Sequence, residues 1–268
     1  MLRASIVMRR VLPHQVSWGT TFAEGLRAHG IEVSMGDTAS RVTGDFVACW
    51  GWRVAQQYVG AKPVLVFERG YVGDRQEWTS AGWNGLNGRA RFPQVDDRGA
   101  RWEAHFGHLL HPWRDGGEYA LLMGQVRGDS AIERIDIGRW YAEAVAGLRR
   151  HGLPVVFRPH PVEVERGTVP AIDGAPKLRG SLEDALAHAA VVATYNSNTG
   201  VDAVLAGVPT IACDEGSMAW PVTVHGFDEP LQRPDRSEWC ARLAWCQWSK
   251  DELRNGVAWE HLREAMPQ

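Results

Sequence analysis

The stretch of residues 193–213, ATYNSNTGVDAVLAGVPTIAC, constrains the fold of this chain more than any other. It begins at the end of an apolar β run at 191–195, turns through small polar residues, and continues as a short helical pattern that Gly-Val-Pro ends before another β run. A helix that starts directly after a strand leaves backbone N–H groups unpaired, which favours an anion. Ser197, Asn198 and Thr199 add side-chain donors there. Simple capping of the helix by Ser197 or Asn198 is the alternative.

A second β run, at 154–157, ends in Arg158-Pro-His160-Pro. The two prolines stiffen the strand exit and are expected to prevent a helix from starting at once. Arg158 and His160 are then held at the carboxyl end of a strand, which is where ligands bind in open α/β sheets. An ordinary surface loop residue is the alternative for His160.

Strand and helix patterns alternate along the whole chain, which predicts an α/β fold with parallel sheets and right-handed crossovers. The first series has strands at 4–8, 32–35, 46–50 and 64–68, a helix whose face carries Trp18, Phe22 and Leu26, and a short helix at 53–58. The second has strands at 120–123, 154–157, 191–195 and 210–212, and helices at 134–150, 182–189 and 199–205, with two more helices within 237–265. We expect two Rossmann-like domains, 1–116 and 117–268, which face each other across a cleft, with the C-terminal helices returning toward the N-terminal domain.

The two motifs together resemble the C-terminal half of GT-B glycosyltransferases, over residues 119–225. The nearest likeness is to capsular-polysaccharide and Kdo-transferase-like enzymes, and more loosely to UDP-sugar 2-epimerases of the same fold. The resemblance implies that Arg158, His160 and the Ser197-Asn-Thr199 turn hold the nucleotide and phosphates of a nucleotide-sugar donor. Asp202 stands where a Glu that contacts the ribose is more usual.

Transfer of a sugar requires stabilisation of the negative charge that develops on the leaving phosphate. Arg158, the turn and Arg127 are candidates for this task, and Gln125, His160 and Asp202 are candidates for gripping the nucleotide. The sequence contains no Asp-x-Asp motif and no His/Cys cluster at metal-ligand spacing. We therefore expect a metal-independent enzyme that needs no cofactor besides the nucleotide-sugar co-substrate.

An inverting transfer also needs a base that removes the acceptor proton, and we expect it in the N-terminal half. Glu68 ends an apolar strand, Asp74 follows it in a glycine-rich stretch, and His14 follows the first strand. Each has a plainer alternative: an ion pair with Arg69 or Arg75 for Glu68, a turn residue for Asp74, and a loop residue for His14. A retaining mechanism would not require such a base.

The stretch 69–97 is rich in glycine and tryptophan and has no clear period, so we expect a long functional loop. Trp78, Trp83 and Arg75 are candidates for contacting the acceptor, because aromatic rings stack on sugars and on unpaired bases alike. In the alternative, the tryptophans pack onto the N-terminal sheet in a wrapped loop.

The acceptor is expected to be a saccharide or a modified DNA base. The segments 68–75 and 83–89 resemble, loosely, phage-encoded glycosyltransferases that decorate hydroxymethylated bases, which must leave the duplex stack. The net charge of −3 counts against a duplex partner. A UDP-sugar 2-epimerase-like enzyme and a non-catalytic nucleotide-sugar binding protein are the other classes that remain open.

Composition places the chain among ordinary globular proteins, with 44% hydrophobic and 23% charged residues. The four cysteines lack Cys-x-x-Cys spacing, so we expect reduced thiols in the cytoplasm. No stretch approaches the ~20 apolar residues of a membrane helix.

Overall fold

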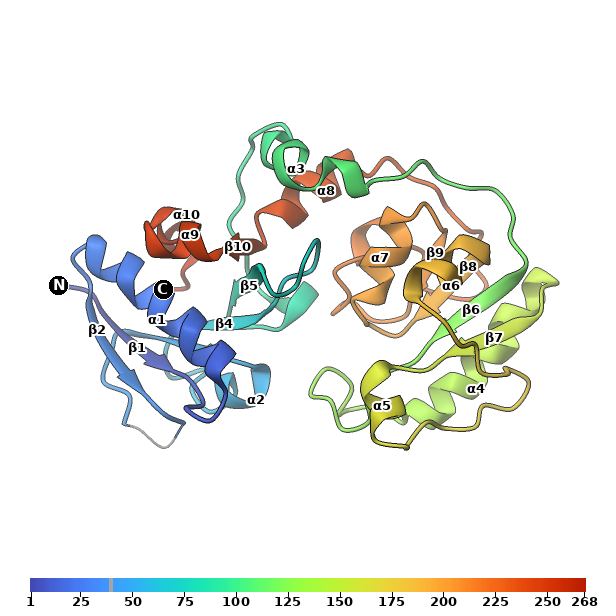
Figure 1. Cartoon of the computed structure of the whole chain (residues 1–268), viewed down its shortest axis with the longest axis horizontal. Coiled ribbons are helices and arrows are strands. Elements are labelled where there is room, and N and C mark those ends of the chain that lie inside the picture. Colours follow the sequence, from blue (N-terminus) through green and yellow to red (C-terminus); the bar gives the residue numbers. More distant parts are fainter. Residues whose placement is uncertain (39–40) are drawn as a thin grey trace. The chain divides into compact units, whose positions relative to one another are not determined.

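A computed structural model describes residues 1–38 and 41–268 of the chain and divides them into two compact units (Figure 1). Unit 1 comprises Met1–Phe106 together with Cys240–Gln268, and unit 2 comprises Gly107–Trp239. These bounds differ from the expected division into 1–116 and 117–268, because the last part of the chain belongs to unit 1.

Unit 1 is built on a six-stranded sheet of order β10-β5-β4-β3-β1-β2. Its strands are β1 (Arg3–Val7), β2 (Glu32–Gly36), β3 (Phe46–Trp50), β4 (Val64–Arg69), β5 (Trp78–Trp83) and β10 (Gln247–Ser249). The pairs among β1 to β4 are parallel, whereas β5 pairs antiparallel with both β4 and β10. The four parallel strands lie where the sequence predicts them.

The helices of unit 1 are α1 (Pro13–Ala28), α2 (Trp52–Ala55), α3 (Ala100–His105), α9 (Lys250–Arg254) and α10 (Val257–Leu262). Helix α8 (Ser237–Ala244) contains the division between the two units. Helix α1 packs on one face of the sheet (Figure 1). Trp18, Phe22 and Leu26 of α1 are buried, so the predicted helix face is confirmed.

The predicted long loop at 69–97 is wrong in part, because β5 lies within it. Its central residues are Thr-Ser-Ala-Gly, which carry too little apolar surface to show the period-2 pattern of a strand. Pairing on both sides stabilises it, with β4 on one side and β10 on the other. The strand β10 likewise lies within the C-terminal stretch 237–265, for which the sequence predicts only helices.

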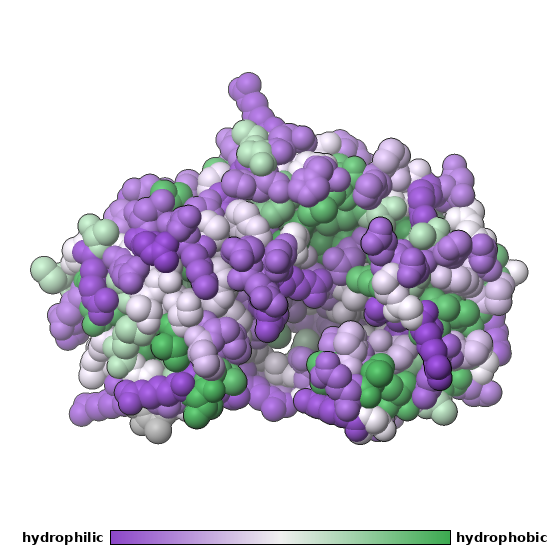
Figure 2. All heavy atoms as spheres, in the orientation of Figure 1, coloured by the Kyte–Doolittle hydropathy of each residue, from purple (hydrophilic) through white to green (hydrophobic). Residues whose placement is uncertain are grey.

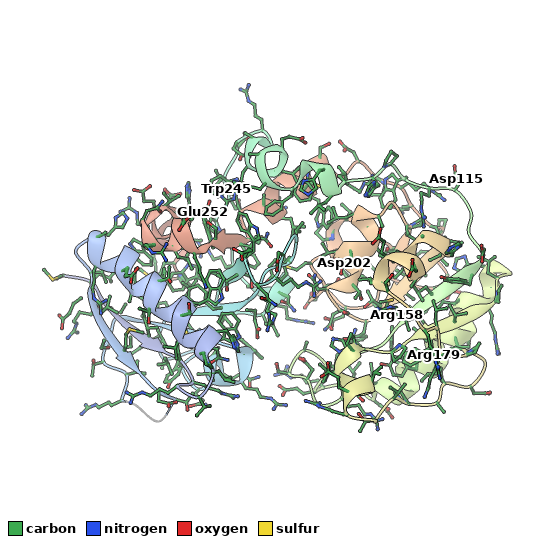
Figure 3. All side chains as sticks on the ribbon, viewed as in Figure 1. Asp115, Arg158, Arg179, Asp202, Trp245 and Glu252 are labelled. Atoms are coloured by element: carbon green, nitrogen blue, oxygen red, sulfur yellow. The ribbon has the colours of Figure 1, made fainter. Side chains whose placement is uncertain are left out.

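Arg101 of α3 fastens the C-terminal segment to the rest of unit 1. Its guanidinium donates to both carboxylate oxygens of Glu252 and to the carbonyl oxygens of Ala244 and Gln247. The same group lies 4.7 Å from the ring centroid of Trp245. Figure 3 labels Glu252 and Trp245 in this segment. These contacts explain why the last helices belong to unit 1.

Unit 2 contains a parallel four-stranded sheet of order β7-β6-β8-β9. Its elements are β6 (Tyr119–Met123), α4 (Ile137–Leu148), β7 (Val155–Arg158), α5 (Pro161–Glu165), α6 (Leu182–His188), β8 (Ala189–Thr194), α7 (Thr199–Leu205) and β9 (Thr210–Ala212). Single turns of 3-10 helix in the chain are η1 (Asn87–Arg89), η2 (Gly107–Leu109), η3 (Arg149–His151), η4 (Trp220–Val222) and η5 (Arg263–Ala265). The chain order reverses between β6 and β8, which makes their carboxyl ends the topological switch point.

Both faces of the unit 2 sheet are covered by helices. Leu122 of β6 packs in a cluster with residues of α4, and its neighbour Leu121 packs in another with residues of α6. Such strands are buried on both sides, which is why they appear in the sequence as continuous apolar runs. Helix α4 starts at Ile137, after the N-cap Asp136, and so begins later than the predicted residue 134.

Candidate functional site

The strand exits of β6 and β7 meet at the carboxyl edge of the unit 2 sheet. The backbone N–H of Gly124 donates to the carbonyl oxygen of Arg158 at 2.8 Å. A Cβ placed on Gly124 would lie 2.7 Å from the backbone nitrogen of His160. Glycine at position 124 therefore permits the close approach that brings Arg158 and His160 beside the end of β6.

Arg158, the last residue of β7, is a half-buried cation whose Nε lies buried without a hydrogen-bond partner. Burial lowers the pKa of its guanidinium, and the nearby carboxylate of Asp202 opposes that shift. Arginine keeps its charge at neutral pH even so. Figure 3 labels both side chains in unit 2. A partly desolvated cation at the carboxyl edge is suited to an anionic ligand group.

His160 is the N-cap residue of α5, and its Nδ1 accepts a hydrogen bond from the backbone N–H of Val162 at 3.2 Å. In a neutral imidazole this leaves the proton on Nε2. The expectation that the prolines delay a helix is wrong here, because Pro161 occupies the first helical position. A proline is tolerated there, since that N–H would have no helical partner anyway.

The turn after β8 is held by its own side chains. The N–H of Ser197 donates to Thr194 Oγ1 at 3.1 Å, and the N–H of Thr199 donates to Ser197 Oγ at 3.3 Å. Asn198 is the N-cap residue of α7. Thr199 Oγ1 lies buried without a hydrogen-bond partner. The Ser197 hydroxyl accepts the Thr199 N–H although Ser197 precedes the N-cap position, whereas the Thr199 hydroxyl keeps hydrogen-bonding capacity that the protein does not use.

Gln125 connects the exit of β6 to this turn. Its backbone N–H donates to Tyr141 Oη at 2.8 Å. With its carboxamide oxygen directed at the turn, Gln125 accepts from the N–H groups of Asn196 (3.2 Å) and Ser197 (3.1 Å). Two N–H groups of the predicted anion site are therefore already bound by protein. Gln125 supports the turn, and this leaves the side chains at the edge to contact a ligand.

Arg127 is held by α5 and the segment after it. Its backbone N–H donates to Glu163 at 3.0 Å, its Nε lies 3.7 Å from the same carboxylate, and its guanidinium donates to the carbonyl oxygen of Thr168. Burial alone would raise the pKa of Glu163, but hydrogen bonds from Thr168 and Arg127 lower it. Arg127 thus compensates a buried carboxylate in this structure. Beside it, a cavity of about 580 Å³ runs between α4 and the segment 170–173.

Two candidates for the base lie at the carboxyl edge of unit 1. His14, in the first turn of α1, meets Trp50 at the end of β3 edge-on, with ring centroids 5.3 Å apart. Burial lowers the pKa of His14, and the charge of Arg69 lowers it further. Glu68 of β4 is half-buried, and its Oε1 lies 3.7 Å from the Cβ position of Gly51, the residue after Trp50. The neighbouring strands β1, β3 and β4 therefore bring His14 and Glu68 to one edge.

The remaining candidates of unit 1 lie elsewhere. Asp74 is exposed, and its Oδ1 accepts from the N–H of Gln76 at 2.8 Å, so the turn alternative describes it. Trp83 is fully buried, and its indole N–H donates to the carbonyl oxygen of Leu262 at 2.8 Å. The packing alternative describes Trp83, which no acceptor can reach. Trp78 and Arg75 are both half-buried.

The sequence analysis does not predict Asn196 or Asp214 as residues of the site, although Asn196 lies within the turn that follows the 191–195 run. Asn196 is 4% exposed, and its Nδ2 donates to the carbonyl oxygen of Ala131 and to Asp214 Oδ1. The one feature that could have indicated Asn196 is its place just after an apolar strand. Its hydrogen-bond partners could not be predicted, because they lie far away in the sequence.

Within residues 1–38 and 41–268, no three His, Cys, Asp or Glu side chains come together as a possible metal site. No helix in that part of the chain has the length and hydropathy needed to cross a membrane. On the face drawn in Figure 2, hydrophilic residues predominate and hydrophobic residues are interspersed among them.

The sequence matches no protein-family model and no curated protein. Among solved structures, the chain is similar to the beta Kdo 2,7 transferase of KpsC from Thermosulfurimonas dismutans, with a TM-score of 0.61 and 14% identity over 96% of this chain and 99% of the other. It is also similar to the beta Kdo 2,4 transferase of the same protein, with a TM-score of 0.59 and 16% identity over 90% of each chain. A more distant match is the UDP-GlcNAc 2-epimerase of Methanocaldococcus jannaschii, with a TM-score of 0.35 and 12% identity over 98% of this chain and 93% of the other.

The likeness to the two transferase structures confirms the predicted fold class. The chain has a GT-B glycosyltransferase-like fold, with two Rossmann-like α/β units. A common fold at this level of identity does not by itself carry a common reaction.

Proposed function

We propose that this chain is a glycosyltransferase that moves a sugar from a nucleotide-sugar donor to an acceptor hydroxyl. The observation that carries the proposal is the group of side chains at the carboxyl edge of the unit 2 sheet, beside the switch point, above all the partly desolvated Arg158 with its unpartnered Nε. The sequence motifs and the fold both support the proposal, because ligands of doubly wound sheets bind at the carboxyl ends of the strands, at the switch point.

On the donor side, Arg158 neutralises the charge that develops on the leaving phosphate. His160 donates from Nε2, since its Nδ1 is occupied by Val162. Thr199 Oγ1 supplies a further hydrogen bond, and Asp202 takes the ribose contact that the family resemblance implies. We assign no donor contact to Arg127, because its guanidinium is bound to Glu163 and to the carbonyl oxygen of Thr168. We propose that the reaction needs no metal, because Arg158 and hydrogen-bond donors stabilise the phosphate.

On the acceptor side, the base is either His14 or Glu68. His14 is neutral at physiological pH, since its pKa lies below the ordinary 6.5, and a neutral imidazole can accept a proton. Glu68 is the carboxylate alternative at the same edge. Asp74 is less suitable, because its carboxylate is engaged in a turn.

We propose a saccharide as the acceptor. The net charge of −3 supports it, because a protein that binds duplex DNA needs basic residues against the phosphates. The similar transferase structures, which are named for Kdo transfer, add to this support. Transfer to a hydroxymethylated oligonucleotide would instead favour the phage-type alternative.

Donor binding is the first test. Nucleotide sugars and the free nucleotides UDP, GDP, ADP and CMP are screened for a rise in the melting temperature of the protein, since a ligand that binds the native state stabilises it. We expect at least one nucleotide family to raise the melting temperature in a concentration-dependent way. A uniform absence of stabilisation would contradict nucleotide-sugar use.

A further inference from the structure

Asn196 is a buried polar residue at the point where three strand exits of unit 2 come together. It directly follows β8 and the residue Tyr195, and only 4% of it is exposed. Its side-chain Nδ2 donates to the carbonyl oxygen of Ala131 at 2.8 Å and to Asp214 Oδ1 at 3.1 Å. One carboxamide thus connects the segment after β6, the turn after β8 and the segment after β9.

The partners of Asn196 carry the donor-edge residues. Ala131 belongs to the segment between β6 and α4, which contains Gln125. With its carboxamide oxygen directed at the turn, Gln125 accepts from the backbone N–H of Asn196. Asp214 Oδ1 also accepts from the N–H of Gly216 at 2.9 Å. The geometry of the turn therefore depends on Asn196 from both sides, through its side chain and through its backbone.

The segment after β9 in turn supports the first turn of α7. Ser217 is 1% exposed, and its Oγ lies 3.6 Å from the Cβ position of Gly200, the residue after Thr199. Asp214 accepts the N–H of Ser217 through its carbonyl oxygen at 2.9 Å. Asp214 and Ser217 thus link Asn196 to the first turn of α7, as Gln125 links it to the exit of β6.

We propose that Asn196 is the positioning residue of the donor site, one that sets the turn Ser197-Asn-Thr199 in the orientation that binds the nucleotide part of the donor. The inference rests on the proposed function and adds a residue and a role to it. Asn196 acts through other residues, since its Nδ2 already donates to Ala131 and Asp214. Its Oδ1 makes no hydrogen bond and lies buried.

Asn196→Asp is an informative substitution, because it removes the two N–H donors of Nδ2 and keeps the shape of the side chain. The Oδ1 atom, which makes no hydrogen bond, is unchanged by it. It also places a carboxylate against Asp214, which adds repulsion. The double variant Asn196→Asp/Asp214→Asn restores the contact between the two side chains with reversed polarity, since position 214 then donates and position 196 accepts, while the N–H of Gly216 loses its acceptor. Asn255→Asp is the matched control, because Asn255 is exposed in unit 1 and uses only its Oδ1, toward the N–H of Val257.

The experiment measures, by titration calorimetry, the dissociation constant of whichever of UDP, GDP, ADP and CMP binds the wild-type chain most tightly. We expect Asn196→Asp to raise that constant about tenfold, as the loss of a buried hydrogen bond commonly does. The double variant should recover part of the loss, and Asn255→Asp should match the wild type. In turnover assays, the KM for the nucleotide sugar should rise while the KM for the acceptor stays unchanged.

A role confined to folding would lower the melting temperature and leave the dissociation constant of the folded protein unchanged, and that result would overturn the proposal. If Asn196→Asp does not fold, Asp214→Ala decides, because Asp214 is only half-buried. It should raise the dissociation constant about threefold or more through the lost contact with Asn196, and an unchanged constant would overturn the proposal. A wild-type chain that binds none of the four nucleotides would contradict the proposed function instead.

Discussion

Arg127 and Arg158 are both basic residues that follow strands of unit 2, yet their surroundings separate their roles. Arg127 contacts the buried carboxylate of Glu163, whereas Arg158 Nε has no hydrogen-bond partner. The sequence predicts that both residues lie at the carboxyl edge, because strand ends can be located from apolar runs. It could not predict their partners, since a glutamate such as Glu163 is normally expected at the surface. Glu163 is buried here only because of tertiary packing.

Substitution of the two arginines should separate binding from stability. Arg158→Ala should raise the dissociation constant for the bound nucleotide about ten- to a hundredfold, because a hydrogen bond to a charged group is lost. Arg127→Ala should lower the melting temperature more and the affinity less, because it leaves Glu163 buried without its cation. Calorimetric titration and thermal unfolding of both variants make the comparison. Equal losses of affinity would contradict the assignment of the phosphate contact to Arg158.

The base is tested by His14→Gln and Glu68→Gln. The variant that removes the true base should lose about 10²- to 10⁴-fold in kcat while it binds the donor nearly as well, because the loss lies in proton transfer. If His14 is the base, activity rises with pH through a pKa below 6.5. Arg69→Ala should then move this acidic limb to higher pH, since part of the depression comes from Arg69. Full activity in both glutamine variants would favour a retaining mechanism.

At the scale of elements, long apolar runs were predicted well and short or small-residue strands were not. The strands β3 and β6 are continuous apolar segments, which the sequence reveals directly. In contrast, β10 pairs with the distant β5, and β5 lies between β10 and its chain neighbour β4. No local pattern records such a pairing, which is why the sequence predicts a loop and helices there.

The Arg101–Glu252 ion pair should hold this C-terminal part in place. Only 8% of the Arg101 side chain and 16% of the Glu252 side chain are exposed. Glu252→Gln leaves a buried guanidinium without its charge partner and should lower the free energy of unfolding by about 3–5 kcal/mol, measured in urea. Arg254→Ala is the control, because its pairs with Glu24 and Asp251 are exposed and should contribute less than about 1 kcal/mol. A loss as small as the control's would show that Arg101 does not fasten the segment.

The same pair gives unit 1 a pH dependence. Burial alone would raise the pKa of Glu252, but the hydrogen bonds and charge of Arg101 lower it below its model-peptide value of 4.5. A carboxyl group whose pKa is depressed by folding stabilises the protein above its unfolded pKa, and the contribution is lost as the pH falls through the folded value. The wild type should therefore lose more stability in that acidic window than Glu252→Gln does.

At the scale of the whole molecule, the alternation of strands and helices predicted an α/β fold with parallel sheets, and the resemblance of the two motifs implied a GT-B-like fold, in a chain that matches no family model. The arrangement of two domains across a cleft stays a prediction, as does the exact place of a domain boundary near the Asp115-Gly-Gly stretch. Alternation locates elements but carries no information on which unit a terminal segment joins. That choice depends on long-range contacts such as those of Arg101.

The most direct test of the account is turnover of the nucleotide sugar that the binding screen selects, assayed with a saccharide primer in the presence of EDTA. The account predicts release of free nucleotide together with an equal amount of glycosylated primer, at a rate that EDTA does not change. Isomerised nucleotide sugar without any acceptor would indicate an epimerase. Tight binding without release, or a strict requirement for a divalent cation, would contradict metal-independent transfer of the sugar.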